Sequence, residues 1–173
     1  MQIEGDVERA RLVGFARTVI YAWALLGGFV LVAVVCVNAY SVLAAALINK
    51  PFPGDFELTE MGTAIAVFCF LPYCQLVGAN VSADVFSMRA GPISRALMSI
   101  FSALVALLFS GLLVWRMSLG LVDYREYPEF TGILEIPIWW AYVPTVLSLI
   151  LLFCAALIAY GQAIADFRKK AAR

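Results

Sequence analysis

Residues 18–49 read TVIYAWALLGGFVLVAVVCVNAYSVLAAALIN, an apolar run without a charged side chain. A helix crosses a hydrocarbon core of roughly 30 Å with about 20 apolar residues, so this run is long enough to span a bilayer. Three further uncharged runs follow, at residues 61–83, 96–115 and 136–165. Lipid offers the backbone no hydrogen-bond partners, and none of the runs alternates like a β-barrel strand. The sequence therefore predicts an all-α integral membrane protein with four transmembrane helices, in a single membrane domain over residues 1–173.

The composition supports this fold class. Hydrophobic residues make up 64% of the 173 residues and charged residues only 14%, whereas a soluble domain carries roughly 25% charged residues. The formal net charge is zero, which leaves no bulk electrostatic attraction for nucleic acid. The first run also exceeds the roughly 7–15 apolar residues of a signal peptide, so we interpret it as a retained helix.

Lysine and arginine predict the orientation, because they are enriched in cytoplasmic loops. Nine of the twelve lie before the first run, between the second and third, or after the fourth. These nine are Arg9, Arg11, Arg17, Arg89, Arg95, Arg168, Lys169, Lys170 and Arg173, and the other three are Lys50, Arg116 and Arg125. Four spans place the nine on one side of the membrane, so we expect both termini in the cytoplasm.

Five aromatic residues are expected to anchor the helices at the membrane interface. Trp and Tyr combine an apolar ring with a polar tip and prefer the headgroup level. Trp139, Trp140 and Tyr142 lie at the start of the fourth run. Trp115 ends the third run, and Trp23 lies near the beginning of the first.

The residues available for chemistry are few. The chain has no histidine, which removes bis-histidine haem ligation, the commonest transition-metal ligand and His-based acid–base catalysis. The four cysteines, Cys36, Cys69, Cys74 and Cys154, lie within the predicted spans and form no C-x-x-C pair. Buried thiols of this kind behave as small apolar groups. We therefore predict a protein that is not an enzyme, with no catalytic residues, no cofactor and no metal site.

Four ionisable residues are candidates for a partner interface: Glu57, Glu60, Asp84 and Arg116. The two glutamates open the second helix, Asp84 follows its far end, and Arg116 is expected to close the third helix. None lies at the predicted bilayer centre, where a charge would indicate an ion pathway. The alternative for Glu60 and Arg116 is a charge among lipid headgroups, and for Asp84 a cap on the following turn.

Small residues also predict close helix packing. Gly62-x-x-x-Ala66 in the second run is a small-x-x-x-small pattern, which lets two membrane helices approach each other closely. This pattern fits a protein whose helices pack against other helices.

Three stretches of sequence carry a family resemblance. They are Glu57-Leu58, Gly78…Asn80-Val81-Ser82-Ala83-Asp84 and Leu134-Glu135-Ile136-Pro137-Ile138-Trp139-Trp140-Ala141-Tyr142. With these motifs in this order, and with its length and four spans, the chain resembles the small membrane subunit of tripartite ATP-independent periplasmic (TRAP) transporters, the DctQ-like family. The family often has a histidine before the aspartate, where this chain has Asn80. A role that needs a titratable group at that position is therefore in doubt.

The resemblance implies a non-catalytic subunit of a sodium-coupled secondary transporter for organic acids, in the bacterial inner membrane. Members of this family associate with a large multi-span permease subunit, and a periplasmic substrate-binding protein docks transiently. The implied role is a scaffold for the permease, with outer loops around residues 51–55 and 123–131 facing the binding protein. The expected partners are thus these two proteins and membrane lipids, and no nucleic acid. Two alternatives are a self-sufficient small tetraspan transporter and a membrane anchor subunit of another complex.

Overall fold

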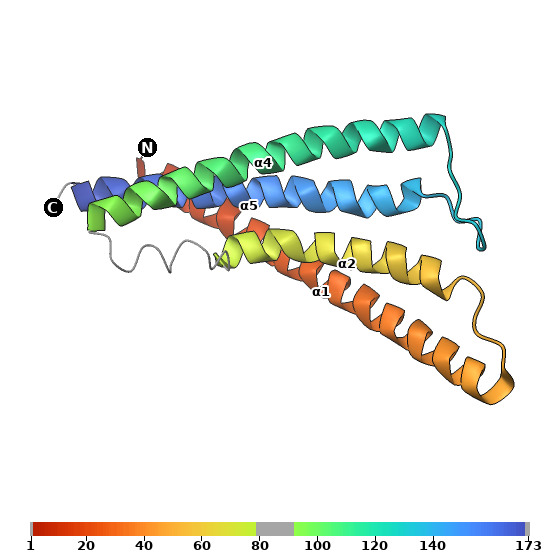
Figure 1. The fold of residues 1–173 in the computed structure, drawn as a ribbon. Helices are drawn as coiled ribbons and strands as arrows, with labels where there is room; N and C mark the ends of the chain where they lie inside the picture. The colour runs from red at the N-terminus through yellow and green to blue at the C-terminus, as the bar shows by residue number, and fades with distance from the viewer. Residues whose placement is uncertain (1, 79–91, 172–173) are drawn as a thin grey trace.

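The computed structural model describes residues 2–78 and 92–171 (Figure 1). Four helices account for most of them: α1 (Gln2–Ile48), α2 (Asp55–Val77), α4 (Pro92–Glu126) and α5 (Trp139–Ala171). Each contains a segment long and apolar enough to cross a membrane, namely Val13–Ile48, Asp55–Val77, Leu97–Glu126 and Trp139–Arg168. Over the described residues, the predicted all-α architecture with four helices long and apolar enough to span a membrane is therefore confirmed. The side of the membrane that the termini face stays a prediction.

Two helices do not start where the uncharged runs start. α2 begins at Asp55, before the run that starts at residue 61, and directly after Gly54, which adopts a left-handed conformation with φ 82°. Asp55 and Glu57 lie in its first turn, where the positive end of the helix dipole favours acidic side chains. α5 begins at Trp139 rather than at residue 136. The predicted end of the second span, residues 79–83, lies outside the described residues.

α4 extends beyond the predicted end of the third span. α4 continues to Glu126, so the expectation that Arg116 closes this helix is wrong. A helix satisfies its own backbone hydrogen bonds in lipid and in water alike, and a single charged side chain does not end it. The loop expected around residues 123–131 is correspondingly shorter, because residues 123–126 are helical.

The helices form an open row. α4 packs on α5, α5 on α2 and α2 on α1, and α1 meets α5 over a small area. Within the described part of the chain, α4 contacts neither α1 nor α2. Figure 1 shows α1 crossing α5 and α2 and then diverging from α5 toward Ile48. The first turns of α1 and the last turns of α5 lie at the same end of the molecule (Figure 1), as an even number of spans requires.

Two glycines allow α1 and α2 to pack closely. A Cβ atom added at Gly27 of α1 would lie 2.6 Å from Cys69 Cβ and 3.2 Å from the Ala66 carbonyl oxygen. A Cβ atom at Gly62 of α2 would lie 2.4 Å from Val34 Cγ2. The Gly62-x-x-x-Ala66 pattern therefore packs against α1 of the same chain.

Polar side chains also join α1 to α2. Asn38 donates from Nδ2 to Thr59 Oγ1 at 2.7 Å. The buried Ser41 hydroxyl donates to the Asp55 carboxylate at 2.5 Å and accepts from the Phe52 backbone N–H at 3.2 Å. The turn between the two helices is thus held by hydrogen bonds from both of them.

The centre of the row is a contact between three helices. The Trp23 indole on α1 donates from Nε1 to Ser148 Oγ on α5 at 2.8 Å. Ser148 Oγ also lies 3.7 Å from Cys69 Sγ on α2 and donates to the Pro144 carbonyl at 2.7 Å. Ser148 is 1% exposed, so its hydroxyl is a fully buried polar link between the helices.

Candidate functional site

The candidate site is the end of the molecule where α2 and α5 begin and α4 ends. It is built on the segment between α4 and α5, which folds back on itself. Phe130 and Pro137 form an isolated antiparallel β-bridge. The Thr131 N–H donates to the Ile136 carbonyl and the Ile138 N–H to the Glu129 carbonyl, each at 3.0 Å. We call residues 127–138 the outer loop, after the side of the membrane that the Lys and Arg distribution predicts for them.

Glu57 ties the outer loop to α2. Its carboxylate accepts one hydrogen bond from the Ile133 backbone N–H at 2.7 Å and another from the Leu134 N–H at 3.0 Å. Hydrogen bonds to an ionised acceptor are roughly twice as strong as those between neutral groups. A helix terminus and a loop that lie 76 residues apart in sequence are thereby joined.

An apolar contact reinforces this link. The Leu134 side chain covers Gly54, where an added Cβ atom would lie 2.4 Å from Leu134 Cγ. Gly54 is buried and left-handed, so a glycine is favoured there both by its φ angle and by the space that Leu134 occupies. The outer loop is held against the start of α2 by one polar and one apolar contact.

Aromatic contacts join the ends of α4 and α5. The Arg125 guanidinium lies 5.6 Å from the centre of the Trp139 ring, within the range of a cation–π interaction. Tyr124 and Tyr142 have ring centroids 4.9 Å apart. A Cβ atom at Gly120 would lie 3.1 Å from the Tyr142 ring, so this glycine lets the tyrosine lie against α4.

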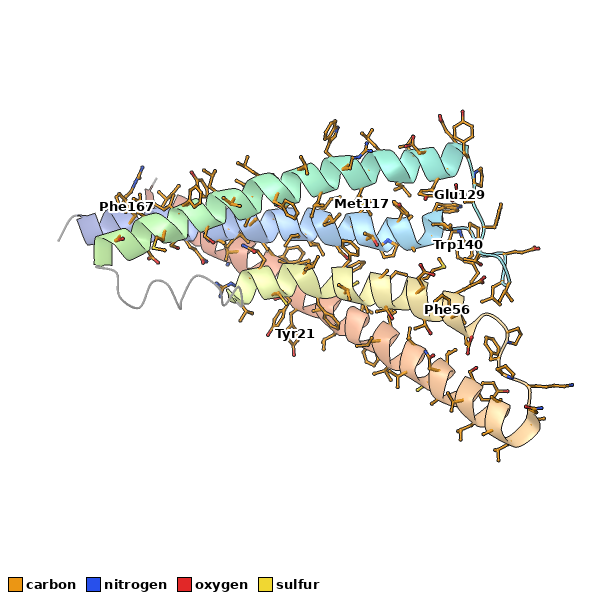
Figure 2. All side chains as sticks on the ribbon, in the orientation of Figure 1. Tyr21, Phe56, Met117, Glu129, Trp140 and Phe167 are labelled. Atoms are coloured by element: carbon orange, nitrogen blue, oxygen red, sulfur yellow. The ribbon has the colours of Figure 1, made fainter. Side chains whose placement is uncertain are left out.

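The exposed surface of this end is both apolar and acidic. Figure 2 shows Glu129 and Trp140 at this end, with Phe56 at the start of α2. Its exposed apolar side chains are Phe56, Tyr127, Phe130, Ile133 and Trp140. Its exposed acids are Glu60, Asp123, Glu126, Glu129 and Glu135.

The four predicted interface residues lie in different surroundings. The Glu57 carboxylate is hydrogen-bonded to the outer loop of the same chain, whereas Glu60 is exposed one turn further along α2. Arg116 is exposed on α4, away from both glutamates in the row. Asp84 lies outside the described residues. The structure thus brings Glu57 and Glu60 to one end and leaves Arg116 apart, and a partner-interface role stays a prediction for all four.

The five predicted anchors fall into two groups. Trp115 and Trp140 are exposed, with 64% and 58% of their surface accessible. Trp139 and Tyr142 contact Arg125 and Tyr124, as described above, and Trp23 is hydrogen-bonded to Ser148. These three side chains therefore hold helices together, and a role as interface anchors stays a prediction for all five.

A shallow apolar groove runs along one side of the α1–α2 pair. It is lined by Leu31, Val34, Val35, Asn38, Ala39, Val42, Leu43, Thr59 and Thr63. The Asn38–Thr59 hydrogen bond supplies the polar atoms in this wall. Such a groove presents a surface for an acyl chain or an apolar side chain of another helix.

Sequence reasoning missed the residues that join the helices. Ser41, Asp55 and Ser148 each make a contact between elements, yet none belongs to a motif. For the two serines the available signal was a small hydroxyl residue within an apolar run, which occurs often in membrane helices and is not specific. In the described residues the cysteines are free and no group of metal-binding side chains is found.

These features define a polytopic α-helical membrane protein with an open row of spans and an ordered loop between α4 and α5. A family model described as "Tripartite ATP-independent periplasmic transporters, DctQ component" matches residues 34–164. The chain belongs to this family, and is thus a small subunit of a TRAP transporter. No curated protein and no solved structure gave a significant match to it.

Proposed function

We propose that the chain is the small, non-catalytic subunit of a sodium-coupled TRAP transporter for organic acids in the bacterial inner membrane, with both termini in the cytoplasm. In this proposal it acts as a scaffold for the large permease subunit and helps to dock the periplasmic substrate-binding protein. The observation that carries the proposal is the open row of four helices in a chain of the DctQ family.

The open row of helices is better suited to a scaffold role than to forming a solute pathway within the chain. A solute path needs polar groups that face an enclosed space between helices. The described helices surround no such space, since α4 and α1 are at opposite edges of the row. In the apolar stretch that qualifies each helix as a span, at most 33% of the residues are buried within the chain, in α5, and only 11% in α1 and α4. This leaves broad helix faces for lipid and for a larger partner.

The ordered outer end supports a docking role. Glu57 and Leu134 hold the outer loop against α2, and Arg125 holds Trp139 against α4. A surface that is ordered before binding loses less conformational entropy when a partner binds. The exposed aromatic and acidic side chains of the outer loop would match a partner with an apolar patch and a basic rim.

The proposal is tested by purifying the tagged chain from its native membrane in a mild detergent. We expect a stoichiometric large multi-span protein to co-elute, and the substrate-binding protein to bind the reconstituted pair. The control is the same purification from cells that lack the tag. A chain that elutes alone and moves a solute in liposomes would instead identify a self-sufficient transporter and refute the scaffold role.

A further inference from the structure

Arg116 lies within the segment Leu97–Glu126 of α4 that is long and apolar enough to cross a membrane, rather than at the end of the helix. α4 continues for ten residues beyond it, to Glu126. Contacts with α5 give its place along the helix pair: Gly120 and Tyr124 lie beside Tyr142, and Arg125 lies beside Trp139. Arg116 is one turn, about 6 Å, inward of Gly120 and about 13 Å inward of Arg125. Figure 2 shows Met117, the next residue, well inward of Glu129 and Trp140.

The surface around Arg116 is apolar on both sides. Leu112, one turn inward, and Leu119 and Val122, one and two turns outward, are exposed on the same helix. The adjacent Trp115 is also exposed. The apolar surface of α4 therefore continues outward past Arg116 for about 9 Å, as far as Val122.

Arg116 makes no ion pair with the described residues. The helix against which α4 packs, α5, carries no acidic side chain between Trp139 and Ala165. The nearest acid on the same face of α4, Asp123, lies two turns further outward, about 10 Å along the helix. Charged side chains at membrane depth are costly unless they pair, and they normally face another helix or a cavity.

The direction of the side chain argues against pairing with outer headgroups. In an α-helix each Cα–Cβ bond tilts toward the helix N-terminus. The N-terminus of α4 is at the opposite end from the outer loop (Figure 1). The Arg116 stem therefore starts inward, and its guanidinium would have to turn back past Leu119 and Val122 to reach the outer headgroups.

We propose that Arg116 forms an ion pair with a carboxylate on a transmembrane helix of the large permease subunit, so that the open face of α4 around Trp115, Arg116 and Leu119 is an interface with that subunit. The inference rests on the function proposed above and identifies one site at which the two subunits are in contact. An arginine can bind a carboxylate through two parallel hydrogen bonds, which fixes the register of two helices as well as attracting them.

The test uses the complex purified from native membranes through the tagged small subunit. Arg116→Gln is expected to lower the amount of large subunit retained by at least about tenfold, because one buried charge then loses its partner. Arg116→Lys keeps the charge but not the bidentate geometry, and should retain an intermediate amount. Leu97→Gln, which adds the same amide at an exposed position near the other end of α4 and outside the proposed contact, is the matched control and should retain most of it. Equal levels of each variant in the membrane fraction show that insertion is unchanged.

A photocrosslinker at Leu119 of the otherwise native chain identifies the neighbour. We expect a crosslink to a membrane segment of the large subunit that contains Asp or Glu, and its loss on Arg116→Gln. Crosslinks to lipid alone, together with full retention of the large subunit by Arg116→Gln, would overturn the proposed ion pair. That result would indicate that Arg116 binds a lipid phosphate group instead. Failure of the unmodified chain to retain the large subunit would instead refute the proposed function.

Discussion

The indole N–H of Trp23 on α1 donates a hydrogen bond of 2.8 Å to the hydroxyl of Ser148 on α5, 125 residues away in the sequence. The same hydroxyl lies 3.7 Å from the thiol of Cys69 on α2. These three residues mark the place where α1, α2 and α5 meet. α1 diverges from α5 beyond this point (Figure 1).

Ser148→Ala should destabilise the protein by about 0.6–2 kcal/mol, the range for interhelical hydrogen bonds in membranes. Trp23→Phe removes the donor and also packing area, so it should cost more. In the double variant the two effects should be less than additive, because each single change already breaks the bond. Thermal unfolding in detergent measures these differences. Ser102→Ala, at an exposed position of α4, is the control, and full additivity would contradict a direct bond.

Alanine substitutions at two adjacent glycines of α1 should change the stability of the protein by different amounts. Gly27→Ala places a Cβ atom 2.6 Å from Cys69 Cβ, which cannot move without the α2 backbone, and overpacking of this kind costs about 1–3 kcal/mol. Gly28→Ala meets nothing within 4 Å and should be neutral or slightly stabilising, because alanine favours a helix. The midpoint of thermal unfolding of the two variants provides the comparison. An equal loss in both would show that α1 and α2 do not pack through Gly27.

Glu57→Ala should release the outer loop. The backbone N–H groups of Ile133 and Leu134 lose their acceptor, so their hydrogen exchange should accelerate by roughly tenfold. Glu57→Gln keeps one acceptor oxygen and should give an intermediate rate. Exchange followed by mass spectrometry of the peptide that covers residues 127–138 measures the effect. Glu60→Ala serves as the control, and the same acceleration in that variant would argue against a specific role of Glu57.

Alanine substitutions at two left-handed glycines should distinguish the cost of backbone strain from the cost of steric overlap. Gly54 (φ 82°) and Gly78 (φ 69°) both adopt a conformation that costs an L-residue about 1–2 kcal/mol. Gly78→Ala has free space and should show this cost alone, measured by thermal unfolding. Gly54→Ala also meets Leu134 and should be worse, with partial recovery when Leu134→Ala is added. If stability does not recover in the double variant, the Leu134 side chain moves away from the added methyl group without cost.

The predicted orientation can be measured independently of any partner. A single cysteine placed at Glu129 in a chain whose four native cysteines are replaced should react with a membrane-impermeant maleimide from the periplasmic side. A cysteine placed at Arg168 should react only after the membrane is opened. The opposite labelling pattern would invert the topology, since the Lys and Arg distribution predicts both termini inside.

Much of the fold follows from the sequence because its causes are local. An uncharged run such as residues 18–49 must form a helix in lipid, whatever its neighbours are, since its backbone groups have no other partners. Helix ends were harder to predict. A charge gap ends at Arg116, but α4 continues to Glu126, because helical hydrogen bonding does not depend on where the bilayer ends.

The candidate site was predicted less completely. Glu57 was selected as a charged residue at a span end, and its carboxylate is bound by the outer loop of the same chain. Nothing local in the sequence distinguishes it from Glu60, which is exposed. The difference arises from where residues 133–134 fall once α5 lies beside α2.

The sequence by itself determined the class, the number of spans and the family, because hydropathy, charge and short motifs are properties of residues close together in the chain. Only the tertiary structure decided that Gly27 rather than Gly28 faces α2, that Ser148 accepts from Trp23, and that Arg116 lies inward of Tyr142. These relationships depend on the rotation and register of helices far apart in sequence, and packing of complementary surfaces sets both.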